Sequence, residues 1–145
     1  MSEAMTKTEN KGAMMVSDVM NTGVCYTDMN LADRSAAVAF YNATSNPMNK
    51  LKEHVNEVLN LVHVSVECVE VRKEDAPEGK AIAPRIVLIT DDGQSYACVS
   101  VGVYQSLKRL FTLLGTPDTW AEPVKIKPVL ISTKKGQVLS LNLVW

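Results

Sequence analysis

The sequence has few cysteines, only two histidines and no long apolar run, and each shortage argues against a class of protein. The three cysteines, Cys25, Cys68 and Cys98, are widely spaced and form no C-x-x-C pair, so we expect neither a disulfide framework nor a zinc site. With only His54 and His63 as imidazole ligands, we expect no metal centre. No apolar run approaches the ~20 residues of a membrane span, and the N-terminus shows no secretory signal. These absences predict a cytoplasmic protein that makes no membrane contact.

Motifs of the common enzyme classes are also missing. The sequence contains no G-x-x-x-x-G-K-[ST], G-x-G-x-x-G, G-x-S-x-G or H-E-x-x-H pattern. Asp91 and Asp92 form a carboxylate pair, but they stand beside Gly93 in a hairpin signal, and turn chemistry explains them there. His63 falls on the polar face of a predicted strand, with no carboxylate or cysteine at a spacing that would make a dyad. We therefore expect a protein that is not an enzyme.

The chain has 145 residues, of which 46% are hydrophobic and 21% charged, as is typical of a single globular domain. Residues 1–22 are polar and aperiodic, and we expect a flexible tail there. Residues 23–145 form the predicted domain. Its N-terminal extension has strand composition at 24–29, then a helix that begins after Asp33 and ends at Asn46-Pro47. Residues 48–58 fit either a helix or a loop docked on the rest of the domain.

Alternating apolar and polar residues then predict a series of strands. In Leu61–Val71 the apolar side chains alternate regularly until Cys68, where the phase shifts, and this predicts a β-bulge after Cys68. From Val101 the apolar period lengthens to about 3.6, which predicts a helix that Ser100 caps and Gly115 ends. The predicted strands are 61–71, 81–90, 95–100, 122–132 and 137–145, with hairpin signals at 91–94 and 133–136 and a charged loop at 72–80.

Three strands in a meander, one helix and a final hairpin follow the order of the OB-fold, in which that helix closes one end of a partly open barrel. We therefore predict a mainly β fold: a five-stranded OB-type barrel over about 57–145, with one helix between strands three and four and an N-terminal helical extension. An α+β sandwich with the same elements and no barrel closure is the alternative.

Basic and aromatic side chains of these elements indicate nucleic-acid binding. Residues 81–145 carry seven basic and four acidic side chains, so this half has a charge of +3 in a chain whose net charge is −1. Single-stranded nucleic acid needs cations that follow its phosphates and flat rings on which its bases stack. The candidate contacts are the cations Lys52, Arg85, Lys125, Lys127, Lys134 and Lys135 and the rings Tyr96 and Trp120. Each also has an ordinary structural explanation, because edge-strand lysines prevent aggregation and either ring could cover the edge of a core.

Several stretches of the sequence resemble small single-stranded DNA-binding proteins of bacteriophages. These stretches are 83–108, Gly115-Thr116-Pro117, Trp120-Ala121-Glu122-Pro123 and the Lys-rich strand and hairpin that follow. The resemblance covers the C-terminal two-thirds of the chain and, more faintly, Phe40–Ala43. It implies an OB-fold, non-sequence-specific coating of single strands during phage DNA replication or recombination, no cofactor, and a location in the host cytoplasm.

Single-stranded DNA is therefore the expected partner, with a second copy of the chain or phage replication proteins as further candidates. The near-neutral charge and the apolar segment Leu139–Trp145 would also suit an OB-like protein–protein adaptor that binds no nucleic acid. RNA binding of the cold-shock type is a third possibility. The sequence lacks the acidic C-terminal tail through which bacterial single-strand-binding proteins recruit partners, so we do not expect recruitment of that kind.

Overall fold

The computed structural model describes residues 19–145, apart from 21–22, 24, 73 and 75–77. The flexible tail expected at 1–22 therefore lies mostly outside the described residues. Within it, Val19 is fully buried, and Met20 packs against the same hydrophobic core. The backbone N–H of Gly23 donates to the carbonyl of Val19 over 2.8 Å. The domain thus takes at least two residues of that segment into its packing.

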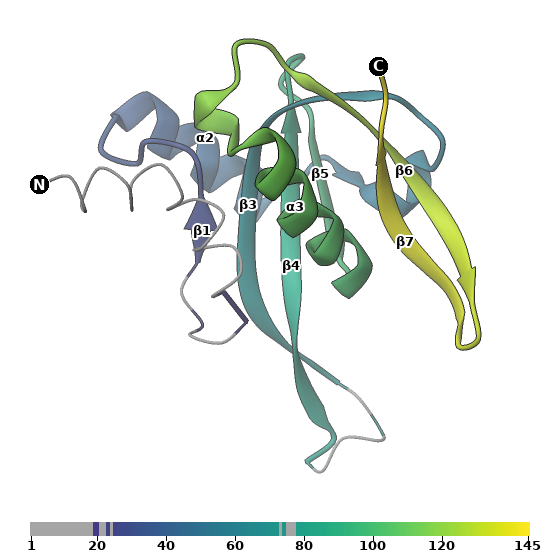
Figure 1. The fold of residues 1–145 in the computed structure, drawn as a ribbon. Coiled ribbons are helices and arrows are strands. Elements are labelled where there is room, and N and C mark those ends of the chain that lie inside the picture. The colour runs from purple at the N-terminus through teal and green to yellow at the C-terminus, as the bar shows by residue number, and fades with distance from the viewer. Residues whose placement is uncertain (1–18, 21–22, 24, 73, 75–77) are drawn as a thin grey trace, which may run out of the picture.

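In the described part of the chain, seven strands form one curled, mainly antiparallel sheet, which wraps into an OB-like half-barrel (Figure 1). Five of them are long and follow the predicted order, with a helix between the third and fourth of the five. These elements are β3 (Leu59–Arg72), β4 (Lys80–Thr90), β5 (Ser95–Val99), α3 (Val101–Leu114), β6 (Val124–Thr133) and β7 (Gly136–Leu143). Across the sheet the long strands lie in the order β5-β4-β3-β6-β7. The mainly β prediction is confirmed, and the strand order is that of an opened barrel.

Besides the five strands predicted for the barrel, the described part of the N-terminal extension contributes two short strands, and the first of them lies within the segment 24–29 of predicted strand composition. β1 (Tyr26–Thr27) pairs antiparallel with β3, and β2 (Asn49–Lys50) pairs parallel with β5. Between them lies helix α2 (Arg34–Ser45), whose N-cap is Asp33 as predicted, since a carboxylate oxygen of Asp33 accepts from the N–H of Ala36 over 3.0 Å. Residues 48–58, for which the sequence allowed either a helix or a loop, contain β2 and the 3-10 helix η1 (Leu51–His54). A further 3-10 helix, η2 (Pro117–Thr119), follows α3.

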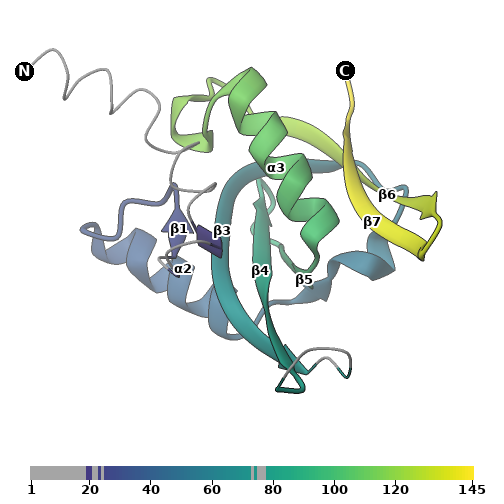
Figure 2. The same cartoon turned by 60° about the horizontal axis from the view of Figure 1, so that its bottom comes forward.

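The bulge in β3 lies near its start, so its prediction after Cys68 is wrong. The register with β4 shifts between Leu61 and His63, which makes Val62 the extra residue. Leu61 and Val64 are both fully buried although they are three residues apart, and the inserted residue permits this. Beyond Cys68 the register is continuous. There β3 and β4 project past the half-barrel as a two-stranded arm (Figures 1 and 2). Because the arm covers no core, its apolar side chains need not all lie on the same face, and the phase shift after Cys68 needs no bulge.

The core lies inside the curl of the sheet, between the strands and α3. Cross-strand partners share a face, and the fully buried pairs Val64↔Leu88 and Val66↔Ile86 face the core. Helix α3 adds the apolar stripe that its 3.6-residue period predicted. The buried members of that stripe are Val103, Tyr104, Leu107, Leu110 and Phe111. Burial of such a side chain contributes roughly 1.5–3 kcal/mol, so this core is the main source of stability.

The half-barrel is not closed by hydrogen bonds between β5 and β7, because no pairing joins these strands in the described part of the chain. The start of α3 bridges the gap instead. The Ser100 hydroxyl donates to the carbonyl of Leu139 over 3.4 Å, and the N–H of Leu141 donates to the Ser106 hydroxyl over 3.2 Å. Gly102 lets the two backbones approach, since a Cβ there would lie 2.2 Å from the Leu139 carbonyl oxygen.

Residues 46–56, which we call the strap, cross the outside of the sheet from α2 toward β6 (Figures 1 and 2). The strap is held along its whole length, at its start, middle and end. The N–H of Met48 donates to the Ser95 hydroxyl over 2.9 Å, Leu51 is fully buried in the core, and the N–H of Asn56 donates to the Pro128 carbonyl over 2.7 Å. The strap therefore spans the open side of the half-barrel between β5 and β6.

Candidate nucleic-acid interface

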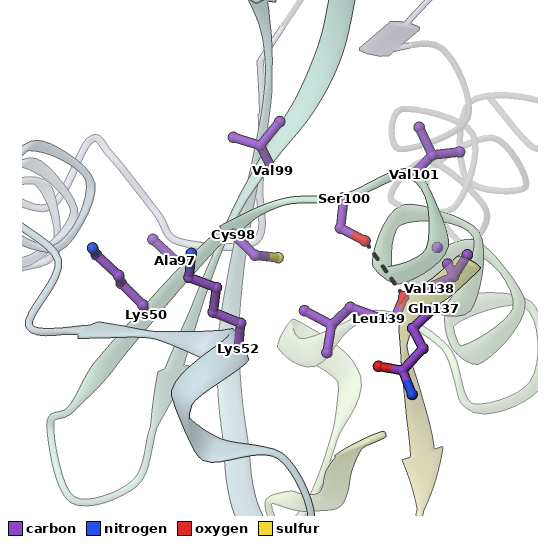
Figure 3. Close-up of a pocket in the computed structure, with 11 residues that line it drawn as sticks. Lys50, Lys52, Ala97, Cys98, Val99, Ser100, Val101, Gln137, Val138 and Leu139 are labelled. Carbon is purple, nitrogen blue, oxygen red and sulfur yellow. Dashed lines mark hydrogen bonds between the residues drawn. The ribbon is translucent and has the colours of Figure 1, made fainter. Parts of the chain in front are cut away.

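A groove remains on the open side of the half-barrel, and we call it the seam groove (Figure 3). It has a volume of about 590 Å³. Four parts of the fold line it: the strap, the end of β5, the start of α3 and the start of β7. The lining residues are Lys50, Lys52, Ala97, Cys98, Val99, Ser100, Val101, Gly102, Gln137, Val138 and Leu139. The groove thus occupies the seam that the missing β5–β7 pairing leaves open.

The charge of the seam groove comes only from Lys50 and Lys52, because no carboxylate is among its lining residues. Both side chains are exposed and form no ion pair with any residue that the structure describes. Lys50 pairs in register with Ala97, so it lies on the outer face of β5. In Figure 3 the two lysines stand on one side of the groove, with Gln137 and Leu139 on the other. An unpaired +2 charge beside a polar and apolar groove suits a phosphate backbone.

A second hollow lies at the open end of the β6–β7 hairpin, and we call it the end hollow. Its volume is about 930 Å³. Its lining residues are Asn60, Asp91, Leu114, Thr119, Trp120, Ala121, Glu122, Pro123, Val124, Lys125, Leu143, Val144 and Trp145. The side chains of Asp91 and Glu122 outweigh that of Lys125, so the lining side chains carry a net charge of −1. The end hollow is therefore more acidic than the seam groove.

Arg85, predicted as a phosphate contact, is engaged inside the protein. Its Nη1 donates to Glu67 Oε1 over 2.9 Å, and its Nη2 donates to the carbonyl of Thr44 over 2.8 Å. The second bond ties the C-terminal turn of α2 to the outer face of β4. A DNA contact by Arg85 stays a prediction, and it would have to compete with both of these partners.

The two rings predicted to stack on bases pack against the core. Tyr96 is 7% exposed, and its ring meets that of His54 edge-on, with 5.0 Å between the ring centroids. Trp120 packs edge-on against Phe111, and its indole N–H lies 3.1 Å from the carbonyls of Leu114 and Gly115. Tyr96 therefore offers no free face without rearrangement of its surroundings, whereas Trp120 is half-buried and lines the end hollow.

Two other rings are exposed. All eight aromatic side chains lie in the described part of the chain, and among them Tyr41 is 68% exposed and Trp145 fully exposed. Tyr41 lies on α2, in a shallow hollow that Leu31, Ala32, Arg34, Ala37 and Val38 also line. Its neighbour Phe40 on the same helix is half-buried, so Tyr41 is the ring of this pair that faces outward.

The predicted lysines do not form one cluster. Lys52 lines the seam groove and Lys125 the end hollow, while Lys127 is half-buried on β6. Lys134 and Lys135 occupy the turn between β6 and β7, directly before the seam residue Gln137. Lys50, which the sequence analysis missed, joins Lys52 because β2 lies beside β5. No short-range sequence signal marks that parallel pairing.

His63 also has a partner that its local sequence did not reveal. Its Nδ1 lies 2.7 Å from Asp28 Oδ2, and the other carboxylate oxygen of Asp28 accepts from the N–H of Val64 over 2.7 Å. The hydrogen bond with this buried carboxylate raises the pKa of His63 above its usual value. The expectation that no carboxylate pairs with His63 is therefore wrong, and the pair fastens the segment after β1 to β3.

Comparison with known proteins agrees with this geometry. A family model described as phage single-stranded DNA-binding protein matches residues 19–144. No curated protein and no solved structure matches the chain significantly. None of the described helices is long and apolar enough to cross a membrane. The match covers nearly the whole chain, including the N-terminal extension, and the chain therefore belongs to the phage single-stranded DNA-binding protein family, whose ligand is single-stranded DNA.

Proposed function

We propose that the protein coats single-stranded DNA without sequence specificity during phage DNA replication or recombination, and that the strand lies over the strap and the seam groove. The observation that carries this proposal is the charge of the seam groove, which has two unpaired lysines and no carboxylate. In this arrangement Lys50 and Lys52 contact phosphates. Lysine ammonium groups recognise the backbone as point charges and do not read bases, which suits a coating protein.

Tyr41 supplies the stacking ring in this proposal. Its α2 leads directly into the strap, and Arg34 and Val38 line the same shallow hollow. A base on the ring would have an apolar neighbour and a cation for the adjoining phosphate. Trp145, the other exposed ring, lies in the acidic end hollow, where phosphates are repelled. Stacking on tyrosine accepts every base, which again suits binding without sequence preference.

We expect the Lys50→Ala/Lys52→Ala variant to bind oligo-dT about tenfold more weakly than the wild type at ~0.1 M salt. The slope of log K against log salt should fall by about 1.4, since each phosphate contact on a single strand contributes about 0.7. Fluorescence anisotropy of a labelled oligonucleotide over a salt series measures both quantities.

The matched control for this double variant is Lys108→Ala/Arg109→Ala, which removes two charges from α3, away from the seam. This control should leave the affinity and the slope near those of the wild type. Equal losses in the two variants would contradict a seam site, because they would report only the change in net charge. Matched DNA and RNA strands in the same titration measure the preference between the two.

We expect Tyr41→Ala to weaken binding of oligo-dT about tenfold, because stacking is worth roughly 1–3 kcal/mol per base. The exposed ring contributes little to the fold, so the melting temperature should stay within ~2 °C of the wild-type value. Tyr41→Trp should preserve binding. Trp145→Ala should bind oligo-dT as tightly as the wild type. If Trp145→Ala weakened binding and Tyr41→Ala did not, the stacking ring would be Trp145 in the end hollow.

A further inference from the structure

The end hollow is unsuited to DNA but suited to a basic, apolar protein segment. Its walls include Leu114, Trp120 and Trp145, and the Leu114 and Trp145 side chains are exposed. Glu122 forms no ion pair with any described residue, and Asp91 accepts only a long hydrogen bond, of 3.4 Å, from Asn60. Apolar surface with two available carboxylates is characteristic of a protein-binding surface.

A segment with the matching chemistry lies on the same chain. Residues 130–138, which we call the hairpin tip, contain the turn between β6 and β7. The apolar side chains of Leu130, Ile131 and Val138 are exposed there. Lys134 and Lys135 at the turn form no ion pair with a described residue. The hairpin tip is therefore apolar on its flanks and carries a +2 charge at its end.

The hairpin tip and the end hollow lie at opposite ends of the same two strands. The pair Thr133↔Gly136 closes the hairpin, and Ile126↔Leu143 lies next to the end hollow. Strands rise about 3.3 Å per residue, so the ten residues of β6 separate the two ends by about 30 Å. Figure 1 shows the turn and the C-terminus at opposite ends of this hairpin. The tip cannot reach the hollow of its own chain, so any contact between them joins two molecules.

We propose that the hairpin tip of one molecule docks in the end hollow of the next. Lys134 and Lys135 then meet Asp91 and Glu122, while Leu130, Ile131 and Val138 cover the apolar walls around Trp120 and Trp145. The contact uses two different surfaces, so it is heterologous, and each molecule keeps one free tip and one free hollow. Such a contact repeats into an open chain of molecules, which is the geometry of a cooperative coat along a strand.

The contact is small, and we expect it to be weak in free protein and stronger on DNA. A hairpin end buries less than the ~1,200 Å² of a standard interface, which places the contact among transient ones. Molecules bound side by side on one strand have an effective concentration near the millimolar range, and this favours a weak contact between neighbours. The tip shares Gln137 and Val138 with the seam groove, but the charged residues of the contact, Asp91, Glu122, Lys134 and Lys135, do not line that groove. Self-association is therefore measured on the DNA-free protein, and DNA binding by its own titration.

Sedimentation velocity of the DNA-free protein over a concentration series at low salt tests the proposal. The wild type should show a sedimentation coefficient that rises with concentration without levelling at a dimer, and high salt should suppress the rise. Lys134→Glu/Lys135→Glu should lose the rise, because acidic tips then face acidic hollows. Asp91→Lys/Glu122→Lys should lose it as well, and Glu122→Lys alone should weaken it if the turn at Asp91 does not tolerate lysine.

Mixing provides the decisive step, because the two charge-reversed variants complement each other. In a 1:1 mixture, each tip meets a hollow of opposite charge, so the concentration-dependent rise should return. Lys50→Glu/Lys52→Glu is the matched control: it should associate like the wild type while losing affinity for oligo-dT. A wild type that stays monomeric up to ~1 mM, a closed dimer, or a mixture that stays monomeric would each overturn the proposal. These outcomes concern protein alone, so they leave the proposed DNA site to its own titration.

Discussion

Replacing Gly102 with alanine is expected to lower the free energy of unfolding by about 3 kcal/mol. The new Cβ would lie 2.2 Å from the Leu139 carbonyl oxygen and 2.6 Å from a methyl carbon of Val138. A backbone oxygen cannot turn aside as a flexible side chain can, so α3 must move off β7. Such overpacking costs roughly 1–3 kcal/mol, and the movement would also stretch the bonds that Ser100 and Ser106 make to β7, each worth about 1 kcal/mol.

Whether Gly102→Ala destabilises or stabilises the protein tests the close contact between α3 and β7. Glycine to alanine inside a helix normally stabilises a protein by up to ~1 kcal/mol, because alanine has the better helix propensity. Thermal and urea unfolding followed by circular dichroism should instead show a melting temperature lower by roughly 10 °C. Gln105→Ala, at an exposed position on the same helix, is the control and should change stability by less than ~0.5 kcal/mol. A stabilised Gly102→Ala would show that α3 and β7 are not in close contact.

Replacing Tyr96 with alanine is expected to destabilise the fold by at least ~3 kcal/mol, as removal of a buried aromatic ring does. The ring is 7% exposed and packs edge-on against His54, at the place where the strap crosses β5. Its loss would leave a cavity between the strap and the core. Any loss of DNA binding in Tyr96→Ala should therefore accompany a lower melting temperature, in contrast to Tyr41→Ala.

Tyr96→Phe separates packing from chemistry at this position. It keeps the ring and should retain most of the stability and nearly all of the DNA affinity. Unfolding curves and anisotropy titrations on the same samples, at a temperature where each variant is folded, make the comparison. A Tyr96→Ala protein of wild-type stability that no longer binds DNA would restore Tyr96 as a stacking residue.

The long elements could be predicted from the sequence because their side chains obey one period over many residues. On β4, Arg85 lies on the face opposite Ile86 and Leu88, and on α3 the stripe from Val103 to Phe111 marks the buried side. The bulge could not be placed in the same way. Five of the eight residues at 59–66 are leucine or valine, on both sides of the inserted position, and only the register with β4 shows that Val62 is the extra one.

The site was harder to predict because it depends on contacts between distant segments. On β5 the neighbours Ala97 and Cys98 are both small, so the sequence did not reveal which parity faces inward. The pairing of Tyr96 with Leu88 answers that question and places the Tyr96 ring in the core. Arg85 meets Glu67 and Thr44, and Lys50 reaches the seam through β2, by contacts that no local pattern encodes.

The serines that join α3 to β7 have a consequence for solubility. β7 is the last strand of the sheet, and eight residues of unpaired edge would be a template onto which another extended chain could add. The Ser100 and Ser106 hydroxyls occupy the Leu139 carbonyl and the Leu141 N–H, in the middle of that edge. In the proposed coat the molecules would lie at high local concentration, where exposed edges promote fibrous aggregation. Two hydroxyl groups would then let neighbouring molecules crowd along a strand without merging their sheets.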